Sequence, residues 1–301
     1  MAIKIPTPKG FRDIAPELAK RRRETISKIA STLEQYGYVP IETPTLEFAE
    51  TLTGKYGEDE KLIYKFKDRG GRQLAMRYDL TVPLARYIAT NNPTLPFRRY
   101  QVGQVFRGEN PQKGRWREFT QFDFDSAGTP EIEEDAKVIA VAIQCFRQIG
   151  FNKAVMLVND RKNFANFPPE VARAIDKLYK IGESGVISEI VSSGKTEANA
   201  AQIVDQVKST KPTEDLLKIF KILKETYKLK EAVDFSFDPT LVRGLDYYTG
   251  SIFEMKPSNS PVDLTIGSGG RYDNLIGSFS KKDIPAVGFS FGVDRLLEAL
   301  G

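Results

Sequence analysis

Residues 100–128, YQVGQVFRGENPQKGRWREFTQFDFDSAG, predict a long antiparallel hairpin at the centre of the fold. Apolar and polar residues alternate in its first strand, and an Asn-Pro pair and a glycine mark the turn. The second strand places Gln121, Asp123 and Asp125 on one face and phenylalanines on the other. One side of the hairpin is therefore predicted to be polar well beyond its turn.

The loop of this hairpin is charged and contains Arg107, Glu109 and Arg115. A guanidinium group presents a fixed fork of donors that suits phosphate oxygens, whereas a carboxylate suits an amine. The pattern predicts a site that holds a phosphate-bearing ligand beside an ammonium-bearing one. A solvated hairpin tip is the alternative, but the charges here continue into the strand instead of stopping at the turn.

The composition is that of a globular protein with a sizeable core: 301 residues, of which 41% are hydrophobic and 28% charged. The net charge of +4 is compatible with nucleotide or RNA binding. Histidine is absent and Cys145 is the single cysteine, which excludes a histidine base, an internal disulfide and a histidine- or cysteine-ligated metal site. No apolar run approaches the roughly 20 residues of a membrane span. We therefore expect a cytoplasmic protein without a protein-ligated metal.

Three further segments place polar residues at junctions or glycine-rich turns. RYDLT, residues 77–81, lies where a strand gives way to a helix, and Asp79 or Thr81 could serve there as an N-cap or as a ligand contact. LVRGLDYYTG, residues 241–250, sets an arginine, an aspartate and two tyrosines around glycines, where backbone can approach a ligand closely. IGSGGRYD, residues 266–273, predicts a glycine-rich strand and turn.

The remaining chain alternates between helical and strand patterns. Residues 16–36 predict an amphipathic helix that ends at Gly37, and residues 38–46 are strand-like with a break at Pro44. Residues 159–233 have lysine- and glutamate-rich helical patterns without strand alternation. Residues 286–297, AVGFSFGVDRLL, predict a strand, a glycine and the start of a helix, whose N-terminus favours anions.

Together these motifs resemble those of the histidyl-tRNA synthetases, a family of class II aminoacyl-tRNA synthetases. VFRGENPQKGRWREFTQFDFD resembles motif 2 of that class, the helix and strand of residues 16–46 resemble motif 1, and residues 286–297 resemble motif 3. LVRGLDYYTG and GSGGRYD resemble two signatures of the histidyl family. The resemblance implies an α+β fold, with a class II synthetase-like antiparallel sheet flanked by helices and a helical insertion. It assigns residues 1–158 and 234–301 to the catalytic domain and residues 159–233 to the insertion.

The resemblance also implies roles for individual residues. It gives Arg243 and Arg107 the catalytic contacts to the α-phosphate of ATP. ATP binding falls to Arg107, Glu109, Arg115 and Arg295. Histidine binding falls to Asp79, Thr81, Gln121, Asp125, Arg243, Tyr247, Tyr248 and Tyr272. Among these, Asp79 and Thr81 take the α-ammonium group, and Asp125 accepts from an imidazole N–H. Gln112 and Arg117 lie on the loop that approaches the acceptor end of tRNA.

The implied reaction is attack of the histidine carboxylate on the α-phosphorus of ATP, with Mg²⁺ on the phosphates, followed by transfer of the histidyl group to tRNA. Expected partners are histidine, ATP, the tRNA acceptor end and a second copy of the chain in a homodimer. Full synthetases of the family continue beyond motif 3 into an anticodon-binding domain, whereas this sequence stops shortly after it. A regulatory subunit of ATP phosphoribosyltransferase, which shares the fold and binds a partner enzyme, is therefore an alternative. A free amino-acid ligase that forms the same adenylate is another.

Overall fold

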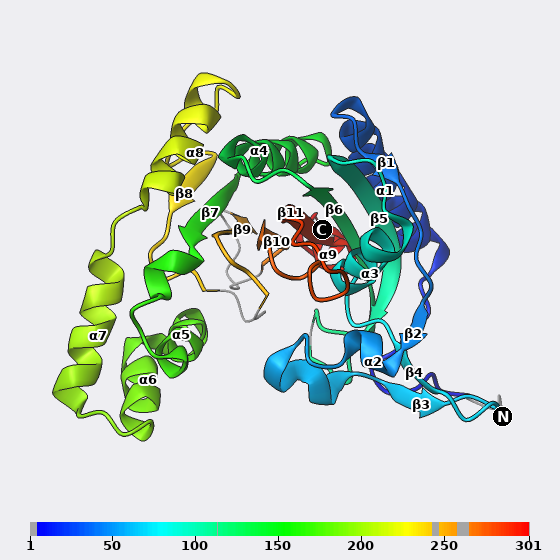
Figure 1. Cartoon of the computed structure of the whole chain (residues 1–301), viewed down its shortest axis with the longest axis horizontal. Coiled ribbons are helices and arrows are strands. Elements are labelled where there is room, and N and C mark those ends of the chain that lie inside the picture. Colours follow the sequence, from blue (N-terminus) through cyan, green and yellow to red (C-terminus); the bar gives the residue numbers. More distant parts are fainter. Residues whose placement is uncertain (1–4, 113, 243–246, 258–264, 301) are drawn as a thin grey trace.

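The computed structural model describes residues 5–112, 114–242, 247–257 and 265–300. Within them, an eight-stranded sheet has the order β1-β5-β6-β11-β10-β9-β7-β8 (Figure 1). Its strands are β1 (Val39–Pro40), β5 (Phe97–Phe106), β6 (Glu118–Ala127), β7 (Ala154–Asp160), β8 (Phe235–Phe237), β9 (Ser251–Pro257), β10 (Gly267–Arg271) and β11 (Ala286–Gly292). Neighbouring strands are antiparallel except β1–β5 and β7–β8. The predicted α+β fold with a mostly antiparallel sheet is confirmed.

The predicted hairpin is β5–β6, and its pairing runs without a break from Phe97 opposite Ala127 to Phe106 opposite Glu118. The second strand is longer than the alternation alone predicts. Phe122 and Phe124 lie in the main core, as expected for one face of the strand. The polar residues of the other face are buried as well, so this strand carries polar side chains into the interior.

Helices cover one face of this sheet. The helices are α1 (Pro16–Gln35), α4 (Ile132–Gln148), α8 (Glu214–Glu225) and the C-terminal α9 (Val293–Leu300). In Figure 1, α8, α4 and α1 follow one another along the outside of the sheet. Phe146 of α4 packs against Phe289 and Phe291 of β11, with ring centroids 5.9 and 5.1 Å apart. The core therefore lies between these helices and the sheet, and the opposite face of the sheet is left for a site.

A smaller three-stranded sheet, in the order β2-β4-β3, stands beside the large one. It comprises β2 (Leu46–Phe48), β3 (Lys65–Lys67) and β4 (Gln73–Met76), with α2 (Ala49–Leu52), η1 (Gly57–Leu62) and α3 (Thr81–Asn91) packed nearby. The strand-like stretch predicted over residues 38–46 is interrupted, as expected at Pro44, and only β1 and the start of β2 are regular there. Pro40 and Pro44 lack the backbone N–H that a continuous ladder requires.

Residues 161–225 form helices, as the composition predicts, but these helices pack in two ways. The helices are η2 (Arg161–Phe164), α5 (Pro169–Ile175), α6 (Leu178–Ser192), α7 (Glu197–Ser209) and α8. The first four share a core cluster of their own, whereas Leu216, Ile219 and Phe220 of α8 belong to the main core. We propose that α5 to α7 are the insertion proper and that α8 is part of the catalytic unit. The domain boundaries otherwise remain a prediction.

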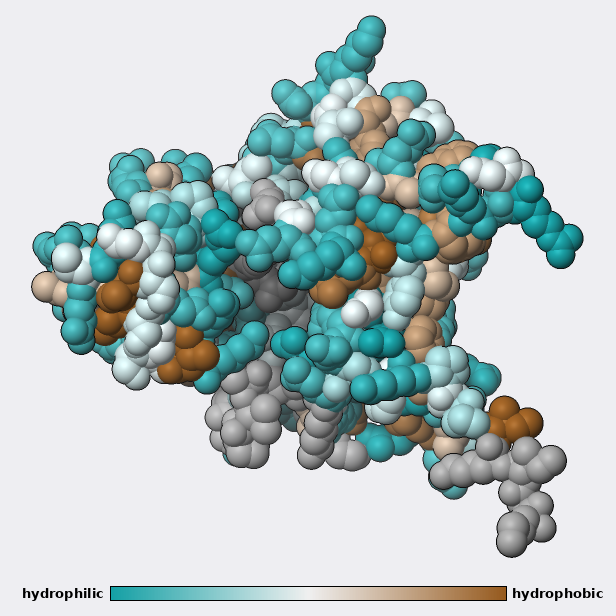
Figure 2. Space-filling view, turned by 90° about the horizontal axis from the view of Figure 1, so that it is seen from below, coloured by the Kyte–Doolittle hydropathy of each residue, from teal (hydrophilic) through white to brown (hydrophobic). Residues whose placement is uncertain are grey.

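The surface is dominated by polar and charged residues. In the view of Figure 2, hydrophilic residues cover most of the face and hydrophobic ones occur in small separate groups. Among the helices of the described ranges, none combines the length and apolar character that crossing a membrane requires.

Candidate active site

A cavity of about 540 Å³ lies on the face of the sheet that the helices leave open. Strands β6, β10 and β11 supply its floor, and residues from the hairpin tip, η1, α5 and α6 line its sides. It brings together most of the residues that the sequence predicts for a site: Asp79, Thr81, Arg107, Glu109, Gln112, Arg115, Gln121, Asp125, Tyr247, Tyr248, Tyr272 and Arg295. Residues more than 200 positions apart in the chain thus share one cavity.

Asp79, Asp123 and Asp125, here called the carboxylate cluster, line this cavity, and each is at most 3% exposed. Asp79 Oδ2, Asp123 Oδ1 and the amide oxygen of Gln121 accept no hydrogen bond within the described residues, whereas Asp125 Oδ2 is held by an ion pair with Arg99. A buried acceptor without a donor costs free energy. The cluster is therefore suited to a ligand that carries several N–H groups.

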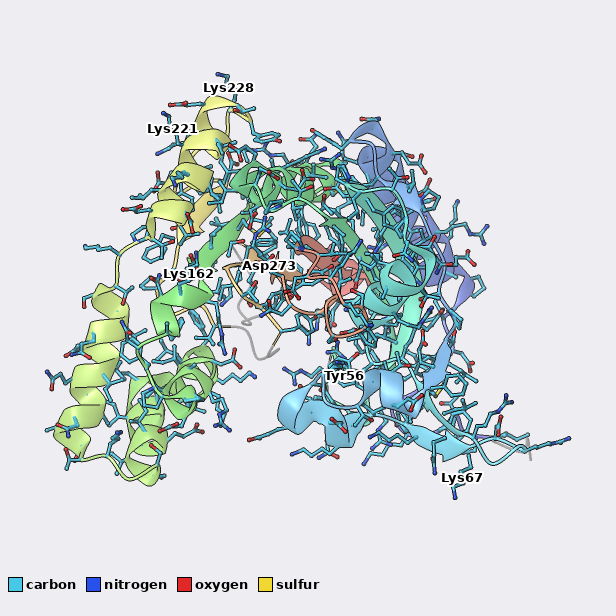
Figure 3. The ribbon with its side chains drawn as sticks, in the orientation of Figure 1. Tyr56, Lys67, Lys162, Lys221, Lys228 and Asp273 are labelled. Carbon is cyan, nitrogen blue, oxygen red and sulfur yellow. The ribbon has the colours of Figure 1, made fainter. Side chains whose placement is uncertain are left out.

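Asp79 combines the two roles that the sequence left open. Its Oδ1 accepts from the backbone N–H groups of Thr81 and Val82, at 3.1 and 3.0 Å, which caps the start of α3. The same oxygen accepts from Tyr56 Oη at 3.0 Å; Tyr56 lies on the side of η1 that faces the middle of the molecule (Figure 3). Burial raises the pKa of Asp79, and these donors and the charge of Arg107 oppose that rise. One carboxylate oxygen is thus structural and the other is left for a ligand.

Asp125 is fixed by residues of β5 and β11 and by Tyr272, which directly follows β10. Its Oδ1 accepts a hydrogen bond of 2.5 Å from Tyr272 Oη, and its Oδ2 forms an ion pair of 2.8 Å with Arg99 of β5, whose side chain is fully buried. On β11, a Cβ atom at Gly288 would lie 1.8 Å from Asp125 Oδ1, so only glycine fits there. Burial raises the pKa of Asp125, while Arg99 and the Tyr272 hydrogen bond lower it. The carboxylate is held in one orientation before any ligand arrives.

Asp123 lies between Gln121 and Asp125 on the same face of β6. Burial and the neighbouring charge of Asp125 raise its pKa to about 7, although Arg99 opposes the rise. A hydrogen bond with Ser290 of β11 also lowers this pKa. Asp123 is therefore close to half protonated near neutral pH, which is unusual for an aspartate.

We expect Asp123→Asn to remove a pH dependence of stability in the protein without ligand. Because the pKa is raised from 3.8 to about 7 on folding, the folded state holds the proton more tightly. The stabilisation from this proton is present at low pH and is lost as the pH rises through about 7. Relative to wild type, the free energy of unfolding of the variant should therefore rise by roughly 2–3 kcal/mol between about pH 5 and about pH 8. Urea denaturation of both proteins at both pH values tests this. If the difference in free energy of unfolding between variant and wild type were the same at the two pH values, the expectation would be wrong.

Aromatic rings line the cavity beside the carboxylate cluster. The rings of Tyr247 and Tyr248 lie 4.9 Å apart, and those of Tyr247 and Tyr272 lie 5.9 Å apart edge to face. Burial raises the pKa of Tyr247 and Tyr272 well above that of a free tyrosine. Their hydroxyl groups therefore stay protonated. Flat rings next to acidic groups suit a planar ligand that donates hydrogen bonds.

The arginines of the cavity come from the hairpin tip and from α9. The Arg107 guanidinium lies over the rings of Tyr78 and Phe119, at 4.4 and 5.1 Å, and its Nε donates to the Tyr78 carbonyl at 3.2 Å. Its two Nη atoms donate no hydrogen bond within the described residues, so they remain available for an anion. Arg115 pairs with Glu109 at 3.5 Å, and Arg295 donates to a backbone carbonyl at 3.2 Å.

Asp294 ties the hairpin to both ends of the described chain. Its Oδ1 accepts from Arg12 at 2.6 Å and from Arg22 of α1 at 3.1 Å, and its Oδ2 accepts from the Thr120 backbone N–H at 2.8 Å. The Arg12 guanidinium also lies 4.4 Å from the ring centroid of Trp116. These contacts fix the start of α9, and with it Arg295, against the base of the hairpin tip.

Comparison with known proteins identifies the family. The model of the histidyl-tRNA synthetase family matches residues 10–167 and 185–296. The chain belongs to the histidyl-tRNA synthetase family. A histidine–tRNA ligase of Korarchaeum cryptofilum is 42% identical over 98% of this chain and 74% of its own length. The resemblance stated from the sequence motifs is therefore confirmed.

Solved structures agree with this membership. The histidyl-tRNA synthetase of Nostoc is 29% identical, with a TM-score of 0.82 over 99% of this chain and 76% of that one. A protein of Bacillus halodurans, described as an ATP phosphoribosyltransferase regulatory subunit/histidyl-tRNA synthetase, is 25% identical, with a TM-score of 0.78 over 100% of this chain and 84% of that one.

One described residue with a role implied by the histidyl-tRNA synthetase motifs, Arg117, stands apart from the cavity. Arg117 does not line it; its guanidinium donates instead to the backbone carbonyls of Glu109 and Lys9, at 2.9 and 3.5 Å. The tRNA contact assigned to Arg117 stays a prediction. Arg243 lies outside the described residues, so its predicted catalytic role also stays a prediction.

Asp123 and Arg99 are two residues of the site to which the sequence motifs assign no role. The alternation Gln121-Asp123-Asp125 is a signal for Asp123, since all three residues share one face of the strand. No comparable local signal marks Arg99, because its pairing with Asp125 depends on the register of β5 against β6.

Proposed function

We propose that this chain is a histidine–tRNA ligase that activates histidine with ATP and transfers it to tRNA. The proposal rests on the cavity of this family member, in which buried acceptors lie beside the arginines Arg107, Arg115 and Arg295. Such a cavity suits an amino acid with a basic side chain beside a nucleoside triphosphate.

Histidine is assigned to the carboxylate cluster. Asp79 Oδ2 and Thr81 receive the α-ammonium group, which carries three N–H donors, and Asp79 Oδ2 has no other hydrogen-bond partner within the described residues. Asp125 accepts from an imidazole N–H, and Tyr272 keeps its carboxylate in place. Gln121, Tyr247 and Tyr248 complete this half of the site.

ATP is assigned to the arginines. Arg107 receives the α-phosphate, Arg295 the γ-phosphate, and Glu109 and Arg115 position the nucleotide, as the family motifs imply. Arg243 is proposed to share the α-phosphate. Histidine carboxylate oxygen attacks the α-phosphorus, the bond to the β-phosphate breaks, and pyrophosphate leaves. Arginines preorganised around the α-phosphate stabilise the charge that develops there. Mg²⁺ enters with ATP as part of the substrate and neutralises the outer phosphates.

The acceptor end of tRNA is assigned to the hairpin tip, with Gln112 at the cavity and Arg117 beside it. Lys221 and Lys228 stand at the outer end of α8, away from the cavity, so they are remote from the transfer step (Figure 3). We also propose a homodimer in the cytoplasm. Leu46, Phe48 and Phe66 of the small sheet are between 41% and 50% exposed, which suits coverage by a second copy.

A regulatory subunit is the second candidate, because the Bacillus halodurans protein carries both descriptions and has the same fold. Such a subunit binds histidine but has no need of a complete ATP site. The arginines and Glu109 that line this cavity therefore favour the ligase.

ATP–pyrophosphate exchange, measured with each amino acid in turn, tests the proposal. We expect exchange with histidine and none with the others, and aminoacylation of histidine tRNA as a second readout. A protein that binds histidine but exchanges no pyrophosphate would instead support the regulatory candidate.

A further inference from the structure

Asp123 is a buried carboxyl group that lines the cavity, and the proposed function assigns it no contact with histidine or ATP. We propose that it is a second acid of the imidazole subsite and takes the ring nitrogen that Asp125 does not take. The inference rests on the proposed function, because it requires histidine in the cavity. It makes Asp123 a determinant of specificity for a ring with two nitrogens.

The first support is placement. Asp123 and Asp125 are consecutive residues on one face of β6, and both line the cavity. Such residues stand about 7 Å apart along a strand. An imidazole ring with a hydrogen bond at each nitrogen spans a comparable length, so two carboxyl groups at this spacing can flank one ring.

The second support is the hydrogen bonding of Asp123. The Ser290 hydroxyl, which accepts from Gln121 Nε2 at 2.8 Å, also forms a hydrogen bond with Asp123. Asp123 Oδ1 has no partner within the described residues, although the side chain is only 2% exposed. A ligand donor would remove the cost of that unpaired acceptor.

The α-ammonium group is the other donor that could reach Asp123. Asp79 already offers it a free oxygen, next to Thr81 at the start of α3. Asp123 lies two residues from Asp125 on the same face of β6, whereas Asp79 belongs to the segment before α3. Asp123 is thus closest along the strand to the acid assigned to the ring, and the ring is the better match.

Two acids around one imidazole must hold one proton between them and the ring. A neutral imidazole has one N–H and one lone pair, so either Asp123 is protonated and donates, or the ring is protonated and donates twice. The charged groups that act on Asp123 are Arg99 from β5, Asp125 on its own strand, Asp79 before α3, and Arg77 after β4. The two positive charges of the arginines offset the two negative charges of Asp125 and Asp79. The proton that titrates is therefore carried by Asp123 or by the imidazole ring.

Calorimetry in buffers of different ionisation enthalpy measures this proton. At about pH 8, where free histidine and Asp123 are both mostly deprotonated, wild type should take up close to one proton per histidine bound. Asp123→Asn should take up almost none, because its amide N–H₂ donates to the ring nitrogen without a proton. Thr120→Val is the matched control: Thr120 is a buried β6 residue outside the cavity lining, and its hydroxyl has no hydrogen-bond partner in the described part of the chain. It should behave as wild type.

Histidines methylated on one or the other ring nitrogen provide a second readout. Wild type should bind both isomers at least about tenfold more weakly than histidine, because each methyl group removes one carboxyl contact. In Asp123→Ala, discrimination against one isomer should largely disappear and discrimination against the other should persist through Asp125. A merely structural role of Asp123 would weaken all three ligands equally.

The possible outcomes distinguish a failure of the proposed function from a failure of the role of Asp123. If wild type fails to bind histidine, the proposed function fails. If wild type binds histidine but Asp123→Asn takes up the same number of protons, or Asp123→Ala keeps both discriminations, the role of Asp123 is wrong while the proposed function stands.

Discussion

Arg107→Ala is expected to lower histidine-dependent ATP–pyrophosphate exchange by about 10²–10³-fold. The Arg107 guanidinium is stacked on Tyr78 and Phe119 and anchored through Nε, so its orientation is fixed before ATP binds. A preorganised donor stabilises the transition state without reorganisation, and its loss should reduce the rate more than it weakens histidine binding. Exchange rates and histidine titrations of the same preparation test both statements.

Arg107→Lys should restore little of this activity. An ammonium group lacks the planar fork, and it cannot stack between two rings while it binds a phosphate at two points. Arg72→Ala is the control, because Arg72 is exposed and its guanidinium pairs with Asp68 beside the small sheet. An exchange rate for Arg107→Ala close to that of Arg72→Ala would remove Arg107 from the site.

Asp79→Asn should raise the KM for histidine by roughly 10²-fold, equivalent to about 3 kcal/mol. Asparagine retains the oxygen that caps α3 and receives Tyr56, but it places an N–H₂ donor where Asp79 Oδ2 meets the ammonium group. Two donors then face each other in a buried site. The variant should remain close to wild type in its free energy of unfolding, since the cap survives.

Asp79→Ala separates the two functions of this side chain. It removes the cap as well as the ligand contact, so it should weaken histidine binding and also lower the free energy of unfolding by about 1–2 kcal/mol. Steady-state kinetics and urea denaturation of the pair report the two effects independently. Equal KM values for Asp79→Asn and wild type would show that the free oxygen does not meet the ligand.

Much of the site follows from local sequence. The alternation in β6 predicts that Gln121 and Asp125 share a face. At the strand–helix junction, the first backbone N–H groups of the helix lack partners, which predicts that Asp79 caps them. The structure shows that Asp79 caps the start of α3 through Oδ1, and its Oδ2 accepts no hydrogen bond within the described residues. The ligand contact of Asp79 stays a prediction. Short-range periodicity determines which side chains point together, and this is why these residues could be found.

Contacts between distant strands could not be predicted in the same way. The Tyr272–Asp125 hydrogen bond joins residues 147 positions apart, and the Arg99–Asp125 ion pair depends on strand register. The close approach of Gly288 to Asp125 likewise requires β11 to be placed next to β6. The raised pKa of Asp123 results from burial that only the assembled sheet produces.

The three-way contact of Asp294 affects how the protein folds during its synthesis. Arg12 precedes Asp294 by 282 positions and Arg22 precedes it by 272. During synthesis, these two arginines therefore lack Asp294 as a partner until nearly all of the described residues have been added. The base of the hairpin tip is tied down by the same residue, through the Thr120 N–H. A nascent chain on the ribosome therefore cannot form this three-way contact until residue 294 has been added, so the N-terminal segment and the base of the hairpin are joined late in the synthesis of the described residues.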